Sequence, residues 1–510
     1  MKRFVTLLLA FIMCSSTFTL LGCAGKTSDG NVLRVCNCED YIDEDLLAEF
    51  TEETGIEVIY STYGTNENLY NELVINPNSY DLVVPSEYMI EKLAEEGRIQ
   101  KLDFTKLAGY KQNVSAYIDG RLNDLKFTVK DGAYKGEEVA LSEFMVGYMW
   151  GTMGWVYSVD KVDVEEVKSW TGVFNNPALA KRITIKDAVR DSYLVGLAMV
   201  YGDQLRQATD NKTITEILNR VDQTSINKVG EKLNSLKSML YGFEVDSGKN
   251  DIVNNRIDAY VAWSGDAAYA IDVASGEVED EDGTMVTNIR DLSYYIPDEG
   301  SNIWFDGFVM PTGSNNYDSA YKFLEFISRP ENVYRNMNYT GYTSMVAGDG
   351  TEEIEIEDED GNVEVMTLFD AVVIDWFDES EDLEVGEGVA VDLSYFFGGQ
   401  NGENTVVVSE EGYGRLIAQY PTAEIVERCA IMNNFSSETL MTINDMWESV
   451  KGETFPIWLI LLIVVLVILL ATAIVLYRNK EKIKWLKLPV KTQTAMEKKG
   501  YKIVKIENIE

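Results

Sequence analysis

The chain of 510 residues contains no histidine. Histidine is the usual general base of serine and cysteine nucleophile systems and the commonest transition-metal ligand, so its absence argues against both kinds of site. The formal net charge is −40 at pH 7. Nucleic-acid phosphates are bound by Lys and Arg, so this charge argues against a nucleic-acid partner. We therefore expect no catalytic residues, no metal site, no cofactor and no nucleic acid.

Cysteine is also scarce, with five residues. An export signal is predicted at residues 1–23, because Lys2 and Arg3 precede an apolar run. This signal ends in Leu20-Leu-Gly-Cys23, which resembles a bacterial lipobox and would make Cys23 the lipidated first residue of the mature protein. The alternative is a signal that is cleaved elsewhere or kept as an anchor. We expect the remaining cysteines to be buried as small hydrophobic residues, with a disulfide to Cys429 left open: Cys36, Cys38 and Cys429.

Charged residues are absent from Ile457 to Tyr477, a run of 21 apolar or uncharged residues. As a helix this run would be about 30 Å long, enough to cross a bilayer. In the following tail, residues 478–510, Lys and Arg outnumber Asp and Glu by ten to four. This asymmetry predicts a cytoplasmic tail, with the bulk of the chain at the outer face of the cytoplasmic membrane. A buried core helix is the alternative.

Hydrophobic residues make up 46% of the chain, enough for two or more domains with full cores. The stretch from Tyr80 to Asp103 predicts a buried strand, a Pro-Ser-Glu-Tyr turn and a helix. Two further strand and helix pairs precede it, so we expect a mainly parallel sheet covered by helices. Ligands bind where such strands end, which makes Ser86 and Tyr88 candidate contacts. An ordinary connection between strand and helix is the alternative.

A second α/β region is predicted beyond the long strand-rich segment from Glu138 to Ser158, with helices at Tyr193–Tyr201, Ile214–Asp222 and Ile226–Leu240. Hairpin turns are expected at Val129–Ala133 and at Asp282-Gly283, and a further helix at Tyr317–Ile327 is expected to stop before Pro330. Ile303-Trp-Phe-Asp306 leads into Gly307-Phe-Val-Met-Pro311, which is expected to cross back to the first region. The pattern predicts two lobes joined by crossing strands, with the boundaries 32–143 plus 306–345 for lobe 1 and 144–305 plus 415–450 for lobe 2.

Lys and Arg are absent between Arg335 and Arg415, where Asp and Glu are dense. Apolar and acidic residues alternate there, so we predict a β-rich acidic insertion at residues 349–411. Calcium binding is conceivable from the carboxylate density, but no Ca²⁺-loop spacing is present, which favours a solvated acidic face.

Several motifs resemble the polyamine-binding proteins of spermidine/putrescine ABC transporters. They are Phe50-Thr-Glu-Glu-Thr-Gly-Ile-Glu-Val-Ile-Tyr-Ser-Thr-Tyr63, Tyr80-Asp-Leu-Val-Val-Pro-Ser-Glu-Tyr88 and Glu96-Gly-Arg-Ile-Gln-Lys101. The resemblance implies a two-lobed, periplasmic-binding-protein-like (type II) fold that captures a polyamine, spermidine or putrescine. It also implies delivery to an ABC permease with a cytoplasmic ATPase. The acidic insertion and the carboxyl-terminal span lie outside the resemblance.

The resemblance also implies ligand contacts. The family pattern falls, with residue types kept, on Tyr41, Ser86, Tyr88, Trp263, Trp304, Asp306 and Tyr342. Asp187-Ala-Val-Arg-Asp191 resembles a family turn that assigns Asp191 to an amine, while Asp187 reads as a helix N-cap. Carboxylates at ammonium spacing and aromatic faces suit a polyamine on chemical grounds as well. Trp263 and Trp304 could instead be core residues between the lobes.

The sequence departs from the family at three positions. Cys38 stands where the family often has tryptophan, which implies the loss of an aromatic wall. Glu39 stands where a small hydroxyl residue is common, which implies an added carboxylate. The family also has a ligand-contacting glutamine near the carboxyl end. This chain has no glutamine at the matching position, and Met432 is the nearest residue by spacing. Two other functions stay open: a membrane-tethered surface sensor or adhesion module with a vestigial cleft, and an extracellular hydrolase with paired carboxylates such as Asp187 and Asp191.

Overall fold

The computed structural model describes residues 31–279, 285–287, 290–357, 363–381, 383–384 and 387–452. The chain divides into two compact units, Met1–Asn444 and Asp445–Glu510, and the first carries the features described below. Within the described ranges, no helix has the length and apolar character needed to cross a bilayer. The predicted signal with Cys23, the predicted span at 457–477 and the tail at 478–510 lie outside the described residues, and these three stay predictions.

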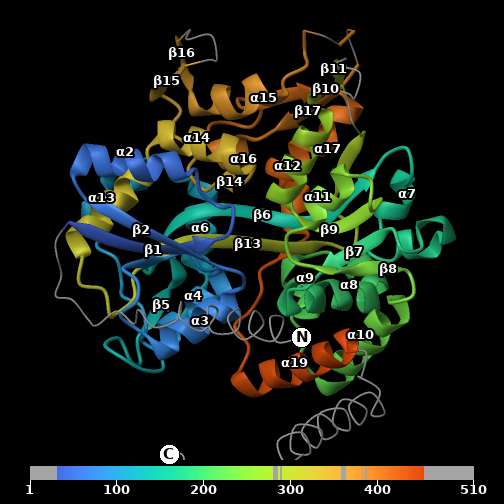
Figure 1. The fold of residues 1–510 in the computed structure, drawn as a ribbon, viewed down its shortest axis with the longest axis horizontal. Helices are drawn as coiled ribbons and strands as arrows, with labels where there is room; N and C mark the ends of the chain where they lie inside the picture. The colour runs from blue at the N-terminus through green and yellow to red at the C-terminus, as the bar shows by residue number, and fades with distance from the viewer. Residues whose placement is uncertain are drawn as a thin grey trace, which may run out of the picture. The chain divides into compact units, whose positions relative to one another are not determined.

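The core of the first unit is a mixed sheet whose main strand order is β2-β1-β3-β13-β6-β9-β7-β8 (Figure 1). Three strands at one end are parallel and define lobe 1: β1 (Val32–Cys38), β2 (Glu57–Tyr63) and β3 (Leu82–Val83). Three strands at the other end are also parallel and define lobe 2: β7 (Ile183–Lys186), β8 (Leu240–Glu244) and β9 (Ala259–Trp263). The predicted parallel sheet is therefore confirmed in both lobes.

Two long strands run between the lobes. β6 (Met145–Ser158) is buried at all of its 14 residues, and it pairs antiparallel with β13 (Ser301–Val309). β13 also pairs with β3, and β6 also pairs with β9, so the two strands join both halves of the sheet. The crossing predicted within 138–158 is confirmed as β6, and the crossing predicted at 307–311 falls on β13, which begins earlier, at Ser301. Short strands complete the sheet: β12 (Leu292–Tyr295) and β14 (Thr343–Ser344) on β6, and β19 (Cys429–Ala430) on β13.

Helices cover both faces of the sheet in lobe 1, as Figure 1 shows for α2 and α13 on one face and α3 and α4 on the other. The amphipathic pattern explains α2, which Asp43 caps at its start and Gly55 ends at a φ of 69°. A hairpin of β4 (Lys126–Thr128) and β5 (Glu138–Ala140) follows, close to the predicted turn at 129–133. The helices of this lobe are α2 (Glu44–Thr54), α3 (Asn66–Ile75), α4 (Glu87–Glu95), α5 (Ala108–Asn113), α6 (Ala116–Asp124), α13 (Tyr317–Ile327) and α14 (Pro330–Thr340).

Lobe 2 repeats this arrangement around its own strands (Figure 1). Helix α8 contacts β7, while α11 and α12 contact β9. The predicted helices beginning near 193, 214 and 226 are confirmed as α8, α9 and α10. The helices are α7 (Val164–Val167), α8 (Val189–Gln207), α9 (Asn211–Leu218), α10 (Gln223–Leu236), α11 (Gly248–Val253), α12 (Ser264–Ser275), α17 (Glu410–Gln419) and α18 (Ala423–Glu427). The strands β10 (Glu277–Glu279) and β11 (Met285–Thr287) pair antiparallel, and the predicted Asp282-Gly283 turn lies outside the described residues. Helix α19 (Ser437–Lys451) ends the described chain.

The acidic segment 349–411 contains the paired strands that its alternation predicts, but also helical pieces. Two hairpins are formed, β15 (Glu353–Glu357) with β16 (Val363–Thr367) and β17 (Val389–Asp392) with β18 (Thr405–Val408). A π-helix at Asp370–Ile374 and α15 (Asp375–Phe377) lie between the two hairpins, and α16 (Ser394–Phe397) lies between β17 and β18. These pieces bury apolar side chains such as Val373, Phe377 and Phe396, and the Phe396 ring stacks on Trp150 of β6, so the segment packs against the central sheet.

The three cysteines in the described part of the chain are free. Cys36 and Cys429 are buried, as predicted, whereas Cys38 is half-buried at the end of β1. The disulfide to Cys429, which the sequence left undecided, is therefore not formed in this structure.

Candidate functional site

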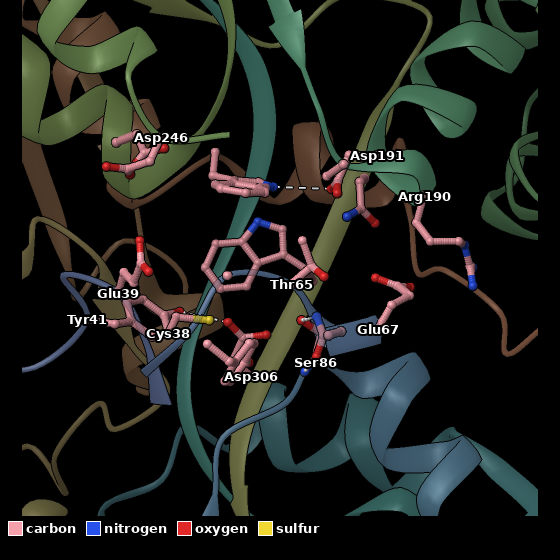
Figure 2. Close-up of a pocket in the computed structure, with 18 of the residues that line it drawn as sticks. Cys38, Glu39, Tyr41, Thr65, Glu67, Ser86, Arg190, Asp191, Asp246 and Asp306 are labelled. Carbon is pink, nitrogen blue, oxygen red and sulfur yellow. Dashed lines mark hydrogen bonds between the residues drawn. The ribbon is translucent and has the colours of Figure 1, made fainter. Parts of the chain in front are cut away.

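A cavity of about 130 Å³ lies where the parallel strands of both lobes end. The residues after β1, β2 and β3 line one wall, and the residues after β7, β8 and β9 line the other. Figure 2 shows these side chains converging from the two lobes, with Glu67 and Asp306 from one side and Asp191 and Arg190 from the other. Carboxyl ends of strands leave backbone and side chains free for ligands, so this position is the one that the sequence predicted.

The structure brings the predicted contact residues together. All nine line the cavity: Glu39, Tyr41, Ser86, Tyr88, Asp191, Trp263, Trp304, Asp306 and Tyr342. Cys38 and Met432 line it as well. Asp187 is not among the lining residues, and the N-cap of α8 is Ala188, so the prediction of Asp187 as N-cap is wrong by one residue. The carboxylate pair that a hydrolase would need, Asp187 with Asp191, is therefore not assembled in the cavity.

Asp306 holds a buried carboxylate on the crossing strand β13. The Tyr41 hydroxyl donates a hydrogen bond of 2.8 Å to its Oδ2. Its Oδ1 has no hydrogen-bond partner among the described residues. Burial raises the pKa of Asp306 to about 6; the nearby Ser86 side chain and the Tyr41 hydrogen bond oppose the shift, and the charge of Asp191 adds to it. A buried acceptor with a free oxygen is a site for a cationic donor.

Asp191 faces the cavity from the first turn of α8. The Trp263 indole donates a hydrogen bond of 3.2 Å to its Oδ1, drawn as a dashed line in Figure 2. Burial raises the pKa of Asp191 to about 6, although the indole hydrogen bond and the Lys186 charge oppose the shift. Asp191 and Asp306 each carry a cost of burial that a ligand cation would relieve.

Aromatic side chains form the walls between these carboxylates. The ring of Tyr342 lies edge-on to Trp304 at 5.8 Å and to Tyr41 at 4.8 Å between centroids. Two glycines permit this packing: a Cβ on Gly151 would lie 2.6 Å from the Trp304 ring, and a Cβ on Gly265 would lie 2.2 Å from the Tyr342 ring. The predicted aromatic contacts are thus held in place by close backbone approach.

Polar residues of lobe 1 support the same wall. The Asn66 side-chain amide donates a hydrogen bond of 2.9 Å to the Ser86 hydroxyl and accepts one of 3.1 Å from the Ser86 N–H. The Tyr88 hydroxyl donates 3.1 Å to Glu67. Ser86 is the N-cap of α4 and forms a β-bridge with Asp306, so it is fixed by backbone as well as by side chain.

The sequence departures have different outcomes. Glu39 is exposed and adds a carboxylate to the cavity lining. Cys38 is uncharged there, because burial raises the pKa of its thiol far above the usual range. Cys38 lines the cavity with a small side chain, so no aromatic ring is present at this position.

Several lining residues were missed by the sequence reasoning: Thr65, Asn66, Glu67, Arg190, Asp246, Lys249 and Asp266. The strand-end rule applied to Tyr63 would have pointed to Asn66 and Glu67, because they follow β2 directly. Asp246 and Lys249 follow β8, a strand that was not predicted. No group of three Cys, Asp or Glu residues positioned to hold a metal ion is found within the described ranges.

Comparisons with known proteins agree with this geometry. The family model for bacterial extracellular solute-binding proteins matches residues 45–349. The putrescine-binding periplasmic protein SpuD of Pseudomonas aeruginosa is 33% identical over 341 residues, 65% of this chain and 82% of that protein. A spermidine/putrescine-binding periplasmic protein of Salmonella typhimurium is 27% identical over 320 residues, 62% of this chain and 79% of that protein.

Solved structures share the fold. A spermidine/putrescine ABC transporter substrate-binding protein of Streptococcus pneumoniae aligns with a TM-score of 0.54 at 24% identity, over 83% of this chain and 100% of its own. The TpPotD lipoprotein of Treponema pallidum aligns with a TM-score of 0.53 at 16% identity, over 82% of this chain and 99% of its own. At these identities the likeness supports the two-lobed α/β fold.

Proposed function

Because the chain belongs to the bacterial extracellular solute-binding proteins, we propose that its cavity captures a polyamine between the two lobes and delivers it to an ABC permease. The observation that carries the proposal is the buried Oδ1 of Asp306, which faces an aromatic cavity and lacks a partner among the described residues. The relatives named as putrescine- or spermidine/putrescine-binding proteins support the choice of ligand.

A polyamine offers ammonium groups separated by methylenes, and the cavity offers a complement to each. One ammonium would donate to Asp306 Oδ1, which the Tyr41 hydrogen bond holds in orientation. A second would lie near Asp191 and Glu67, whose carboxylates belong to opposite lobes. Ammonium groups placed there would neutralise charges that burial now disfavours.

The indole rings suit the methylenes. Trp304 and Trp263 both line the cavity, and the Lys186 ammonium lies 4.0 Å from the centroid of the Trp263 ring. One face of Trp263 is thus used by a cation of the chain itself, which leaves the other face for the ligand. Ring faces also favour an ammonium over a neutral ligand.

Binding residues from both lobes link capture to closure. Tyr41, Ser86 and Glu67 belong to lobe 1, whereas Asp191 and Trp263 belong to lobe 2. β6 and β13 join the lobes, so bending at these strands would close the cavity on the ligand. We propose that the closed form is the one delivered to a permease coupled to a cytoplasmic ATPase.

The site argues for a binding protein and against an enzyme, as does membership in a solute-binding family. The comparisons do not favour the surface sensor or adhesion module. We further propose that Cys23 carries a lipid and that residues 457–477 span the membrane, which would keep the cavity at the outer face of the cytoplasmic membrane.

Calorimetry tests the function. The full-length protein, purified in mild detergent and freed of bound ligand, is titrated with putrescine, with spermidine and with glutamate as the amino acid control. We expect saturable heat and a raised melting temperature with at least one polyamine, and neither with glutamate. No heat and no thermal shift with both polyamines would overturn the proposal and leave the surface module as the better account.

A further inference from the structure

One end of the cavity already contains an ammonium group, that of Lys249. This side chain begins in α11 of lobe 2 and is 10% exposed. Its Nζ lies 2.9 Å from Asp246, 3.6 Å from Asp40 and 3.8 Å from Asp266. These carboxylates raise the pKa of Lys249 although burial opposes them, so the group is charged.

A second lysine, Lys186, neutralises carboxylates at the same end of the cavity. The Lys186 side chain is fully buried, and its Nζ lies 3.2 Å from Asp266 Oδ2 and 3.7 Å from Glu244. The Tyr342 hydroxyl donates 2.9 Å to Asp266 Oδ1. Both oxygens of Asp266 therefore already have donors within the chain, and the charge of this carboxylate is balanced by lysine.

The rest of the cavity differs in how its carboxylates are paired with cations. In the described part of the chain, Asp306, Asp191 and Glu67 form no ion pair with a lysine or arginine. The second cation that lines the cavity, Arg190, lies 4.5 Å from the Tyr88 ring and 4.0 Å from the Phe435 ring, and its Nη2 donates 2.7 Å to the Asn433 carbonyl. Figure 2 shows Asp246, the closest partner of Lys249, on the far side of the cavity from Arg190 and Glu67.

We propose that Lys249 determines specificity, because its ammonium takes the place of a third ligand ammonium and makes the cleft select diamines over triamines. This inference rests on the proposed function. A diamine can use the carboxylates of Asp306 and Asp191 without approaching Lys249. A triamine that reached the Asp246 and Asp266 carboxylates would bring a positive charge against two lysines. Putrescine and spermidine are the probes that separate the two classes.

The test compares the dissociation constants of putrescine and spermidine for the full-length protein and for Lys249→Met, which keeps the unbranched stem of the side chain and removes its ammonium group. We expect the unmodified protein to bind putrescine at least ten times more tightly than spermidine. In Lys249→Met, spermidine should gain at least tenfold in affinity, because Asp246 and Asp40 lose their cation and Asp266 keeps only that of Lys186, while putrescine changes less than threefold. Lys212→Met, at an exposed position of α9, is the matched control and should change neither constant.

Two further variants keep the test decisive. Lys249→Arg retains the charge and should retain the preference for putrescine. Lys249→Gln can still donate to Asp246 and replaces Lys249→Met if the latter does not fold by circular dichroism. Equal affinities in the unmodified protein, or an unchanged ratio in the neutral variants, would overturn this inference while leaving polyamine binding intact. Loss of both ligands in every form, the unmodified protein included, would overturn the proposed function itself.

Discussion

The Tyr41 hydroxyl donates a 2.8 Å hydrogen bond to the Asp306 carboxylate, joining residues that lie 265 positions apart in the chain. Tyr41 follows β1 of lobe 1, and Asp306 belongs to the strand that crosses between the lobes. This bond occupies one oxygen of the carboxylate and directs the other to the cavity. A buried carboxylate fixed in this way is prepared for an ammonium donor before the ligand arrives.

Replacing Asp306 by asparagine should weaken polyamine binding by about 30-fold or more, because loss of one partner of a buried charge pair typically costs about 2–5 kcal/mol. The Tyr41 hydroxyl can still donate to the amide oxygen, so we expect the fold to be kept. Calorimetry with putrescine measures the change. Asp318→Asn, at a side chain that is 91% exposed, is the control. An Asp306→Asn protein with unchanged affinity would refute the assigned role.

Ligand affinity should fall as pH falls through about 6. Without ligand, burial raises the pKa of Asp306 and of Asp191 to about 6, and a bound ammonium favours the ionised form of both. Below pH 6 the ligand must therefore displace protons from the two carboxyl groups, whereas above pH 7 both groups are already charged. Titrations at pH 5, 6 and 7.5 should show a decrease in affinity of up to about tenfold per group for each unit below 6.

The Asp306→Asn protein provides the control for this pH effect, since it lacks one of the two titrating groups and should show a shallower dependence. Proton release, measured by repeating the calorimetry at pH 6 in buffers of different ionisation enthalpy, gives an independent reading. Affinity that stays flat from pH 7.5 to pH 5 would argue that neither carboxylate contacts the ligand ammonium.

Gly151→Ala should weaken binding without touching the ligand. A Cβ at this position of β6 would lie 2.2 Å from the Ser264 hydroxyl and 2.6 Å from the Trp304 ring, so the indole must move. We expect an affinity loss of about tenfold with the protein still folded. Gly120→Ala, where a Cβ meets nothing within 4 Å in helix α6, should leave affinity unchanged. Equal affinities for the two variants would show that the position of Trp304 does not matter.

The cavity could be anticipated from the sequence because strand ends have a local signal. An apolar run that stops at polar and aromatic residues marks β1, β3 and β9, and the family resemblance then selected residues such as Tyr41, Ser86 and Trp263 within those exits. These positions depend on short stretches of chain, so neither long-range pairing nor side-chain packing was needed to find them.

The missed features depend on weaker or distant signals. β8 reads Leu-Tyr-Gly-Phe-Glu, with a glycine in its centre, and Leu240 was assigned to the preceding helix. Without β8, Lys249 had no place in the site, and nothing local indicated that Lys186 would meet Asp266, 80 residues away. Pro330 was interpreted as a stop signal, yet it begins α14, since proline is favoured in the first turn of a helix.

Glu87→Gln should stabilise the unliganded protein at alkaline pH. Glu87 is 2% exposed, its Oε2 accepts from the Phe305 N–H at 2.9 Å, and its Oε1 has no partner among the described residues. Burial raises its pKa to about 8 from an ordinary 4.5. The folded protein thus holds a proton that the unfolded chain releases, so the stability from this group is present below pH 4.5 and is lost as pH rises to about 8.

Urea unfolding at pH 5 and pH 8.5 measures this effect. Between pH 5 and pH 8.5, the free energy of unfolding of the unmodified protein should fall by on the order of 1–3 kcal/mol more than that of Glu87→Gln, because glutamine stays neutral throughout. Glu87→Gln and the unmodified protein are compared at each pH, so titration of other groups cancels. The same decline in both proteins would mean that Glu87 is charged in the fold.

Phe396→Ala should destabilise the lobes as well as the acidic segment to which Phe396 belongs. Its ring stacks on Trp150 of β6 at 5.3 Å between centroids, and the Ser115 hydroxyl of lobe 1 donates 2.6 Å to its carbonyl. Phe396 is 1% exposed, so truncation leaves a cavity against the central strand and should cost about 3–5 kcal/mol. Val365→Ala, at a 56% exposed position of β16, should change stability by less than about 0.5 kcal/mol. Because Trp150 belongs to the strand that joins the two lobes, we expect one unfolding transition, shifted as a whole to lower urea; an unshifted main transition in Phe396→Ala would instead make the segment an independent appendage.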